Sequence, residues 1–154
     1  GTRSLDPDAA AERMEWVARA MAVARPPLVF KKVDSVLRGR VAVELAGLRL
    51  VFGRMDAVLV PANPGRGRVV RAGVYLVDGV PLDRTPFAAD PEYPAWTAHV
   101  GAILASRSGT SVSLPVVPDC ESPADLARIA SSVRRSDLPA GGSEFFSAVL
   151  SVRY

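Results

Sequence analysis

The chain has 154 residues and a net charge of +3, and 49% of its residues are hydrophobic and 23% charged. Its length fits one domain, and its composition is typical of a globular protein rather than of a disordered chain or a disulfide scaffold. The apolar runs are too short to cross a bilayer and the N-terminus lacks the order of a secretory signal. We therefore expect a cytoplasmic protein with no membrane partner.

Metal and nucleic-acid chemistry are not indicated. A single cysteine and a single histidine give no metal-ligand spacing, so no metal site is predicted. The basic residues are scattered over the chain without interleaved aromatic residues, which argues against a nucleic-acid partner. A small anionic ligand would explain the net positive charge as well as a nucleic acid would.

Helical and strand patterns alternate along the chain. Asp6 is a good N-cap before Pro7, and the Asp78-Gly79 pair between alternating apolar residues is a strong hairpin signal. The elements predicted in order are a helix from Pro7 to before Pro26, a strand over 27–33, a helix over 38–52 closed by Gly53, a strand over 56–60, a hairpin over 73–82, a helix over 94–107, a strand over 112–117, and helices over 122–134 and 143–150. The predicted strand over 27–33, the helix over 38–52 and the strand over 56–60 together form a βαβ unit. The predicted fold is α/β, a three-layer Rossmann-like parallel sheet flanked by helices, with a β-hairpin insertion near 73–82.

Two polar clusters follow the two predicted parallel strands, each a mixture of basic, acidic, hydroxyl and glycine residues. They are the segments 31–39 and 61–68. Open α/β sheets bind ligands outside the carboxyl ends of their strands, so the two clusters are expected to converge on one small ligand.

The first cluster contains the groups that grip an anion. Arg38 supplies a bidentate donor, Lys32 a point charge, and Gly39 permits close backbone approach. Asp34 would accept hydrogen bonds from ligand hydroxyls, and Ser35 would cap the helix or touch the ligand. This combination suits a polyhydroxylated acid. A purely structural alternative remains open, in which Asp34 and Ser35 only cap the helix and the two cations are solvated.

The order of the motifs resembles that of a known family. Lys-Lys-Val-Asp-Ser-x-Leu-Arg-Gly, then Pro-Ala-x-Pro-x-x-Gly-Arg, then Gly-Val-Tyr-x-Val-x-Gly-Val-Pro-Leu-x-x-Thr-x-Phe-Ala-x-Asp-Pro are collinear over residues 31–91. This pattern strongly resembles the N-terminal domain of the four-carbon acid sugar kinase family. Thr2-Arg3-Ser4 and Pro118-Asp119-Cys120-Glu121 are similar to two further family segments.

The resemblance implies a sugar-acid pocket and an activity. In this family the N-terminal domain binds a threonate, erythronate or 3-oxo-tetronate, and a C-terminal domain binds ATP. Carried over to this sequence, the residues implied to line the pocket are Lys32, Asp34, Ser35, Arg38, Gly39, Gly67, Arg68 and Asp90. The expected function is ATP-dependent phosphorylation of a four-carbon sugar acid, with residues 1–154 as one substrate-binding domain.

Two departures from the family lead to further expectations. The opening strand with its Ala-Asp-Asp-x-Thr-Gly loop and the nucleotide domain are not found in the sequence, so the domain is expected to be incomplete, with an unfilled position in the middle of its sheet. ATP and Mg²⁺ are expected only with the full-length enzyme, at sites outside this chain. The alternative is a non-catalytic sugar-acid-binding or assembly module that has lost its kinase half. A homodimer is left open.

Overall fold

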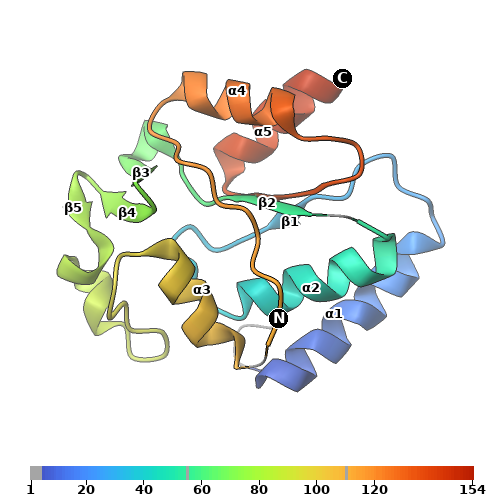
Figure 1. Ribbon diagram of the computed structural model, residues 1–154, viewed down its shortest axis with the longest axis horizontal. Helices are drawn as coiled ribbons and strands as arrows, with labels where there is room; N and C mark the ends of the chain where they lie inside the picture. Colours follow the sequence, from blue (N-terminus) through green and yellow to red (C-terminus); the bar gives the residue numbers. More distant parts are fainter. Residues whose placement is uncertain (1–4, 55, 110) are drawn as a thin grey trace.

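Helices cover both faces of a parallel sheet in the computed structural model, which describes residues 5–54, 56–109 and 111–154 (Figure 1). The sheet has three strands in the order β1 (Lys31–Lys32), β6 (Leu138–Gly141) and β2 (Ala57–Val60). Helices α1 (Pro7–Ala22) and α2 (Val41–Phe52) lie on one face, and α4 (Pro123–Ser132) and α5 (Ser143–Arg153) on the other. The three-layer α/β prediction is therefore confirmed.

The helix boundaries follow local sequence signals. Asp6 caps α1, since its Oδ1 accepts a hydrogen bond from the Ala9 amide at 2.9 Å, and Pro7 is the first helical residue. Ser122 and Asp125 form a capping box at the start of α4. Gly53 ends α2 in the left-handed conformation, with φ of 58°. Each of these starts or stops was predicted from the sequence.

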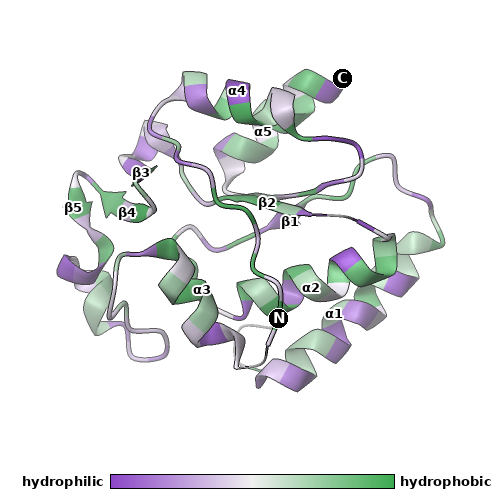
Figure 2. Cartoon of the chain, viewed as in Figure 1, coloured by the Kyte–Doolittle hydropathy of each residue, from purple (hydrophilic) through white to green (hydrophobic). Residues whose placement is uncertain are grey.

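Two hydrophobic cores lie on the two faces of the sheet. The larger core joins α1, α2 and α3 (Val100–Ser108) to the sheet, and the smaller core joins α4 and α5 to the other face. In Figure 2 α2 is mostly hydrophobic along its length, whereas α1 is mixed. This difference arises because α2 packs between the sheet and α1, while α1 has a solvent-facing side. None of the described helices has the length and apolar character needed to span a membrane.

A second, antiparallel sheet carries the predicted hairpin. Its strands are β3 (Arg68–Arg71), β4 (Val74–Val77) and β5 (Val80–Pro81). Two tight turns join them, with positive φ at Ala72 and Gly73 in the first and at Asp78 and Gly79 in the second. Short 3₁₀ helices precede and follow this sheet: η1 (Pro64–Arg66), η2 (Leu82–Arg84) and η3 (Pro86–Ala89).

The middle strand of the parallel sheet is the main correction to the sequence prediction. Residues 27–33 and 56–60 were expected to form neighbouring strands beside an unfilled position, but β6 lies between β1 and β2 and pairs with both. The sequence Leu-Pro-Ala-Gly lacks β-branched residues and contains proline, so it has no strand signature. Strand β1 is also shorter than predicted and covers only Lys31–Lys32; Pro27, where the predicted strand begins, has no amide hydrogen to donate to a ladder.

Two other elements differ in extent from their predictions. The strand expected over 112–117 is reduced to a single parallel bridge between Val116 and Val58, since Pro115 and Pro118 remove donors on either side. Helix α3 begins at Val100 rather than at Pro94. The preceding backbone instead pairs with β4, through a bridge between His99 and Val74 and a hydrogen bond from the Tyr75 amide to the Ala98 carbonyl.

Candidate functional site

Three loops meet at the carboxyl edge of the parallel sheet. The first follows β1 over residues 33–40, the second follows β2 over 61–67, and the third leads from β6 into α5 at Gly142. Because the three strands are parallel, their carboxyl ends lie at the same edge, as expected from the sequence. The antiparallel sheet continues from the second loop, and its Tyr75 contacts the first loop at the Ser35 carbonyl.

Asp34 organises the first loop. Its Oδ1 accepts hydrogen bonds from the Val36 amide at 3.1 Å and the Arg38 amide at 3.3 Å, and so closes a turn. The chain then passes through Leu37, with φ of 62°, and Gly39, with φ of 97°, before entering α2. The alternative in which Asp34 or Ser35 caps the second helix does not hold, because α2 begins at Val41 and its N-cap is Arg40, which makes no side-chain cap hydrogen bond.

Arg38 lies between two carboxylates. Its Nη2 contacts Asp34 Oδ2 at 2.9 Å, its Nε contacts Asp34 Oδ1 at 3.1 Å, and its Nη1 contacts Asp90 Oδ2 at 3.3 Å. Burial raises the pKa of Asp34, but hydrogen bonds from the Arg38 side chain and from two backbone amides outweigh it, and the net pKa is lowered. Asp90 also has a lowered pKa, first because it accepts the Tyr93 amide and then through Arg38. Both carboxylates are therefore ionised acceptors at neutral pH.

Arg68 joins the second loop to the first. Its Nη1 donates a hydrogen bond to Ser35 Oγ, and its guanidinium carbon lies 6.0 Å from the centre of the Phe87 ring. Arg68 forms no ion pair with any carboxylate in the part of the chain that the structure describes. Gly67 precedes it with φ of 65°, and a Cβ at that position would lie 1.9 Å from Asp78 Oδ1. Gly67 thus permits close approach to the hairpin.

The remaining predicted residue, Lys32, stands apart from this group. Its ammonium donates a hydrogen bond to the Val33 carbonyl at 2.6 Å. Its neighbour Lys31 forms a 2.8 Å ion pair with the buried Glu44 of α2. Successive side chains of a strand point to opposite faces, so Lys32 lies on the other side of the sheet from α2.

The arrangement supplies two kinds of recognition. Asp34 and Asp90 offer carboxylate oxygens to hydroxyl groups, and Ser35 offers a hydroxyl. Arg68 offers a guanidinium that pairs with no carboxylate of the described residues and can bind a ligand carboxylate in a bidentate manner. We call Asp34, Ser35, Arg38, Arg68 and Asp90 the edge cluster. Among the described residues no group of three or more His, Cys, Asp or Glu side chains is placed to hold a metal ion.

Comparison with known proteins gives the family. The profile of the family described as "Sugar-binding N-terminal domain" matches residues 1–137. The chain belongs to this family. The match includes every residue of the edge cluster, whereas β6 follows it.

Relatives of this sugar-binding domain include sugar-acid kinases. The D-erythronate kinase of Heliobacterium modesticaldum is 38% identical over 112 residues, which cover 72% of this chain and 26% of the relative. The D-threonate kinase of Salmonella typhimurium is 40% identical over 82 residues, covering 53% of this chain and 19% of the relative. The 3-oxo-tetronate kinase of Methylobacterium radiotolerans is 30% identical over 117 residues, which cover 73% of this chain and 28% of the relative. The chain thus spans about a quarter of the length of such relatives.

Solved structures share the fold of this sugar-binding domain. A crystal structure of a Bordetella bronchiseptica domain of unknown function, described as a domain-swapped dimer with bound citrate, has a TM-score of 0.84 and 28% identity. It is matched over 99% of this chain and 44% of its own. A Haemophilus influenzae protein has a TM-score of 0.85 at 18% identity, over 99% of this chain and 44% of its own, and supports the fold alone. The segment Thr2-Arg3-Ser4, whose sequence is similar to a segment of the family, lies outside the residues that the structure describes.

Two residues that hold the edge cluster in place were not found from the sequence. Tyr75 is fully buried; its hydroxyl donates its one hydrogen to the carbonyl of Ser35 and lies 3.4 Å from that of Pro61, so that it contacts both of the first two loops. Arg107 on α3 donates to the Leu37 carbonyl at 2.7 Å and to the Tyr93 carbonyl at 3.1 Å. Their only sequence signals were an aromatic residue in a strand and a basic residue in a last helical turn, which are too common to be specific.

Proposed function

We propose that this chain is the substrate-binding domain of an ATP-dependent kinase that phosphorylates a four-carbon sugar acid of the threonate, erythronate or 3-oxo-tetronate type. The observation that carries the proposal is the edge cluster, which combines two ionised carboxylates and a hydroxyl with one guanidinium that has no carboxylate partner in the described part of the chain. A sugar acid has one carboxylate and several hydroxyl groups, and so matches these groups in kind and in charge. The names of the kinase relatives support the same class of substrate.

The groups in the edge cluster have distinct tasks in this proposal. Arg68 binds the carboxylate of the acid, while Asp34 and Asp90 accept hydrogen bonds from its hydroxyl groups. Arg38 neutralises the two carboxylates and fixes their orientation, and Tyr75 holds the two loops at a constant separation. Lys32, Gly39 and Gly67 remain predicted pocket residues, with Lys32 available as a long-range cation. This division explains why the cluster contains carboxylates although its ligand is an anion.

ATP and Mg²⁺ belong to this proposal but not to these residues. A polyphosphate needs a loop of free backbone amides, and the Gly65-x-Gly67 segment does not supply one. The Gly65 amide donates to Glu144 Oε2 at 3.1 Å, and the Gly67 amide to the Pro64 carbonyl at 3.0 Å. We therefore place the nucleotide and its metal ion on residues outside this chain, and the reaction in the cytoplasm, where ATP is available.

The test is a calorimetric titration of the full-length protein with D-threonate and D-erythronate, followed by measurement of ATP consumption with the acid that binds. The proposal predicts binding of at least one acid and ATP turnover that depends on it. Binding without turnover would favour the alternative of a non-catalytic binding or assembly module, and the absence of binding to folded protein would contradict the site. The Bordetella structure, described with citrate and as a domain-swapped dimer, makes homodimerisation a further point to measure.

A further inference from the structure

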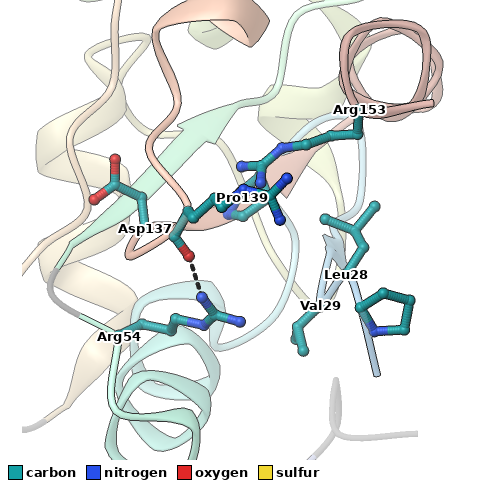
Figure 3. Close-up of a pocket in the computed structure, with 8 residues that line it drawn as sticks. Leu28, Val29, Arg54, Asp137, Pro139 and Arg153 are labelled. Carbon is teal, nitrogen blue, oxygen red and sulfur yellow. Dashed lines mark hydrogen bonds between the residues drawn. The ribbon is translucent and has the colours of Figure 1, made fainter. Parts of the chain in front are cut away.

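A second basic group lies at the amino edge of the parallel sheet, opposite the edge cluster. A pocket of about 170 Å³ is lined by the segment before β1, by Arg54 just beyond the C-cap of α2, by β6 and the loop before it, and by the end of α5. Its lining residues are Pro27, Leu28, Val29, Arg54, Arg135, Asp137, Pro139 and Arg153. Figure 3 shows Arg54 and Arg153 extending toward the middle of the pocket from these separate elements.

The three arginines of this pocket have no carboxylate partners among the described residues. Arg54 donates through Nη1 to the Arg135 carbonyl, and Arg153 donates through Nη2 to the Val133 carbonyl at 3.3 Å and the Arg134 carbonyl at 3.2 Å. The Nε of Arg54 is buried and has no hydrogen-bond acceptor. Arg135 also lines the pocket, at an exposed position, and neighbouring guanidinium groups repel one another unless a negative charge lies between them.

The acidic residues nearby are already engaged. Asp137 lines the pocket, but its carboxylate accepts hydrogen bonds from the Arg134 amide at 3.0 Å and from Arg134 Nε at 3.1 Å and 3.2 Å. In Figure 3 this carboxylate points away from Arg54 and Arg153. Asp56 also pairs with Arg134, at 2.9 Å. One arginine thus satisfies both carboxylates, and the positive charge of the other three is left for a ligand.

We propose that this pocket binds a phosphate group, either as inorganic phosphate or as a phosphomonoester. Guanidinium groups from separate elements match the tetrahedral oxygens of a phosphate dianion. The volume of about 170 Å³ is below the roughly 300 Å³ of a pocket for a drug-sized ligand, so only a small anion is enclosed. The site is separate from the edge cluster, and the proposal does not depend on the proposed kinase function.

A purely structural role is the competing explanation. Cations near the end of a helix stabilise its terminal carbonyls, and Arg153 lies in the last turn of α5. This role fits Arg153 and also Arg54, which follows the C-cap Gly53 of α2, but it does not explain why Arg135 lines the same pocket. It also predicts that phosphate has no effect beyond ionic strength, whereas a binding site predicts a specific response.

The test measures the thermal unfolding midpoint and the calorimetric affinity of the full-length protein with inorganic phosphate, glycerol 3-phosphate and chloride at constant ionic strength. Phosphate or its ester should raise the midpoint where chloride does not, and the tighter binder identifies the source. Arg54→Gln and Arg135→Gln should each weaken binding by about tenfold, the loss expected for one charge-assisted hydrogen bond. Arg13→Gln, at an exposed position on α1, should bind as the unaltered protein does.

Equal responses to phosphate and chloride would overturn the proposal, as would unchanged binding in both variants. Loss of the phosphate response in Arg68→Gln instead would assign the binding to the edge cluster and would also overturn it. If the variants fail to fold, amide chemical shifts of the unaltered protein during a phosphate titration decide the matter. Shifts must then centre on Arg54 and Arg135, and shifts centred elsewhere contradict the site.

Discussion

Asp34 combines a structural and an electrostatic role in one side chain. Its carboxylate accepts two backbone amides of the 33–40 loop and also binds the guanidinium of Arg38. Most of the first loop therefore depends on an ionised carboxylate. This part of the cluster could be predicted from the sequence, because Asp34 and Arg38 are close along the chain. Arg68 and Asp90 are far away in sequence: the convergence of the 61–68 segment with the first loop was expected from the strand ends, whereas Asp90 was connected only by the resemblance to a family.

The ionisation of Asp34 predicts a loss of stability in acid. Its pKa in the folded protein is below the usual value of 3.8, so its contribution is complete above about pH 5 and is lost as the pH falls through the folded pKa. At pH 7, Asp34→Asn should reduce the free energy of unfolding by about 1–2 kcal/mol. The difference from the unaltered protein should shrink below pH 4.

Denaturant unfolding at pH 7, 4 and 3 measures this effect. Glu92→Gln serves as the control, because Glu92 is exposed and its side chain has no ion pair in the described part of the chain. A difference between Asp34→Asn and the unaltered protein that stays constant over this pH range would show that Asp34 is not ionised in the folded state.

Tyr75 is the positioning residue that is easiest to test. Tyr75→Phe keeps the buried ring but removes the hydroxyl that links the Ser35 and Pro61 carbonyls, so it should cost about 1 kcal/mol of stability. It should also weaken sugar-acid binding, because the two loops lose a common anchor. Tyr154→Phe, at an exposed position, should change neither quantity. Normal affinity in a destabilised Tyr75→Phe protein would limit the residue to a role in stability.

At the scale of elements, β6 is the central strand that joins β1 and β2 into one parallel sheet. It pairs with β2 over Leu138–Gly141 and with β1 at Ala140 and Gly141. A Cβ at Gly141 would lie 2.2 Å from the Val60 carbonyl oxygen and 3.0 Å from Phe145, so only glycine allows this close pairing. The strand thus has a sequence reason, although it is visible only once its neighbours are known.

Substitution of alanine for two glycines should have opposite effects. Gly141→Ala should destabilise the protein by about 2–3 kcal/mol or prevent folding, since backbone atoms of β2 must move. Gly101→Ala should stabilise it by about 0.5–1 kcal/mol, because Gly101 lies within α3 and its Cβ would meet no atom within 4 Å. Thermal unfolding of both variants measures the contrast. Similar midpoints would contradict the central position of β6.

The elements that were predicted correctly have local signals, and the others depend on tertiary pairing. Capping residues fixed the starts of α1 and α4, and Asp78-Gly79 marked the turn of the hairpin. Strand β6 lacks such a signal, and the backbone before Val100 is held extended by β4 rather than by its own sequence. The limits of the prediction therefore lie where long-range hydrogen bonds override local preference.

At the scale of the whole molecule, the two edges of the parallel sheet carry different chemistry. The carboxyl edge combines carboxylates, a hydroxyl and an arginine without a carboxylate partner, as a sugar acid requires. The amino edge gathers three arginines around a small pocket. Strands of one sheet lie between the two sites, so we expect ligands to bind at both edges without competing.

The most direct test of the central claim is calorimetric titration of D-threonate and D-erythronate into Arg68→Gln and Arg66→Gln proteins. The two arginines are two positions apart, but Arg68 belongs to the edge cluster whereas Arg66 is exposed on η1. We predict that Arg68→Gln weakens binding of the recognised acid roughly tenfold to a hundredfold, as expected for a lost ionic hydrogen bond. Arg66→Gln should leave it unchanged. Equal affinities in the two variants would contradict the assignment of the edge cluster as the sugar-acid site.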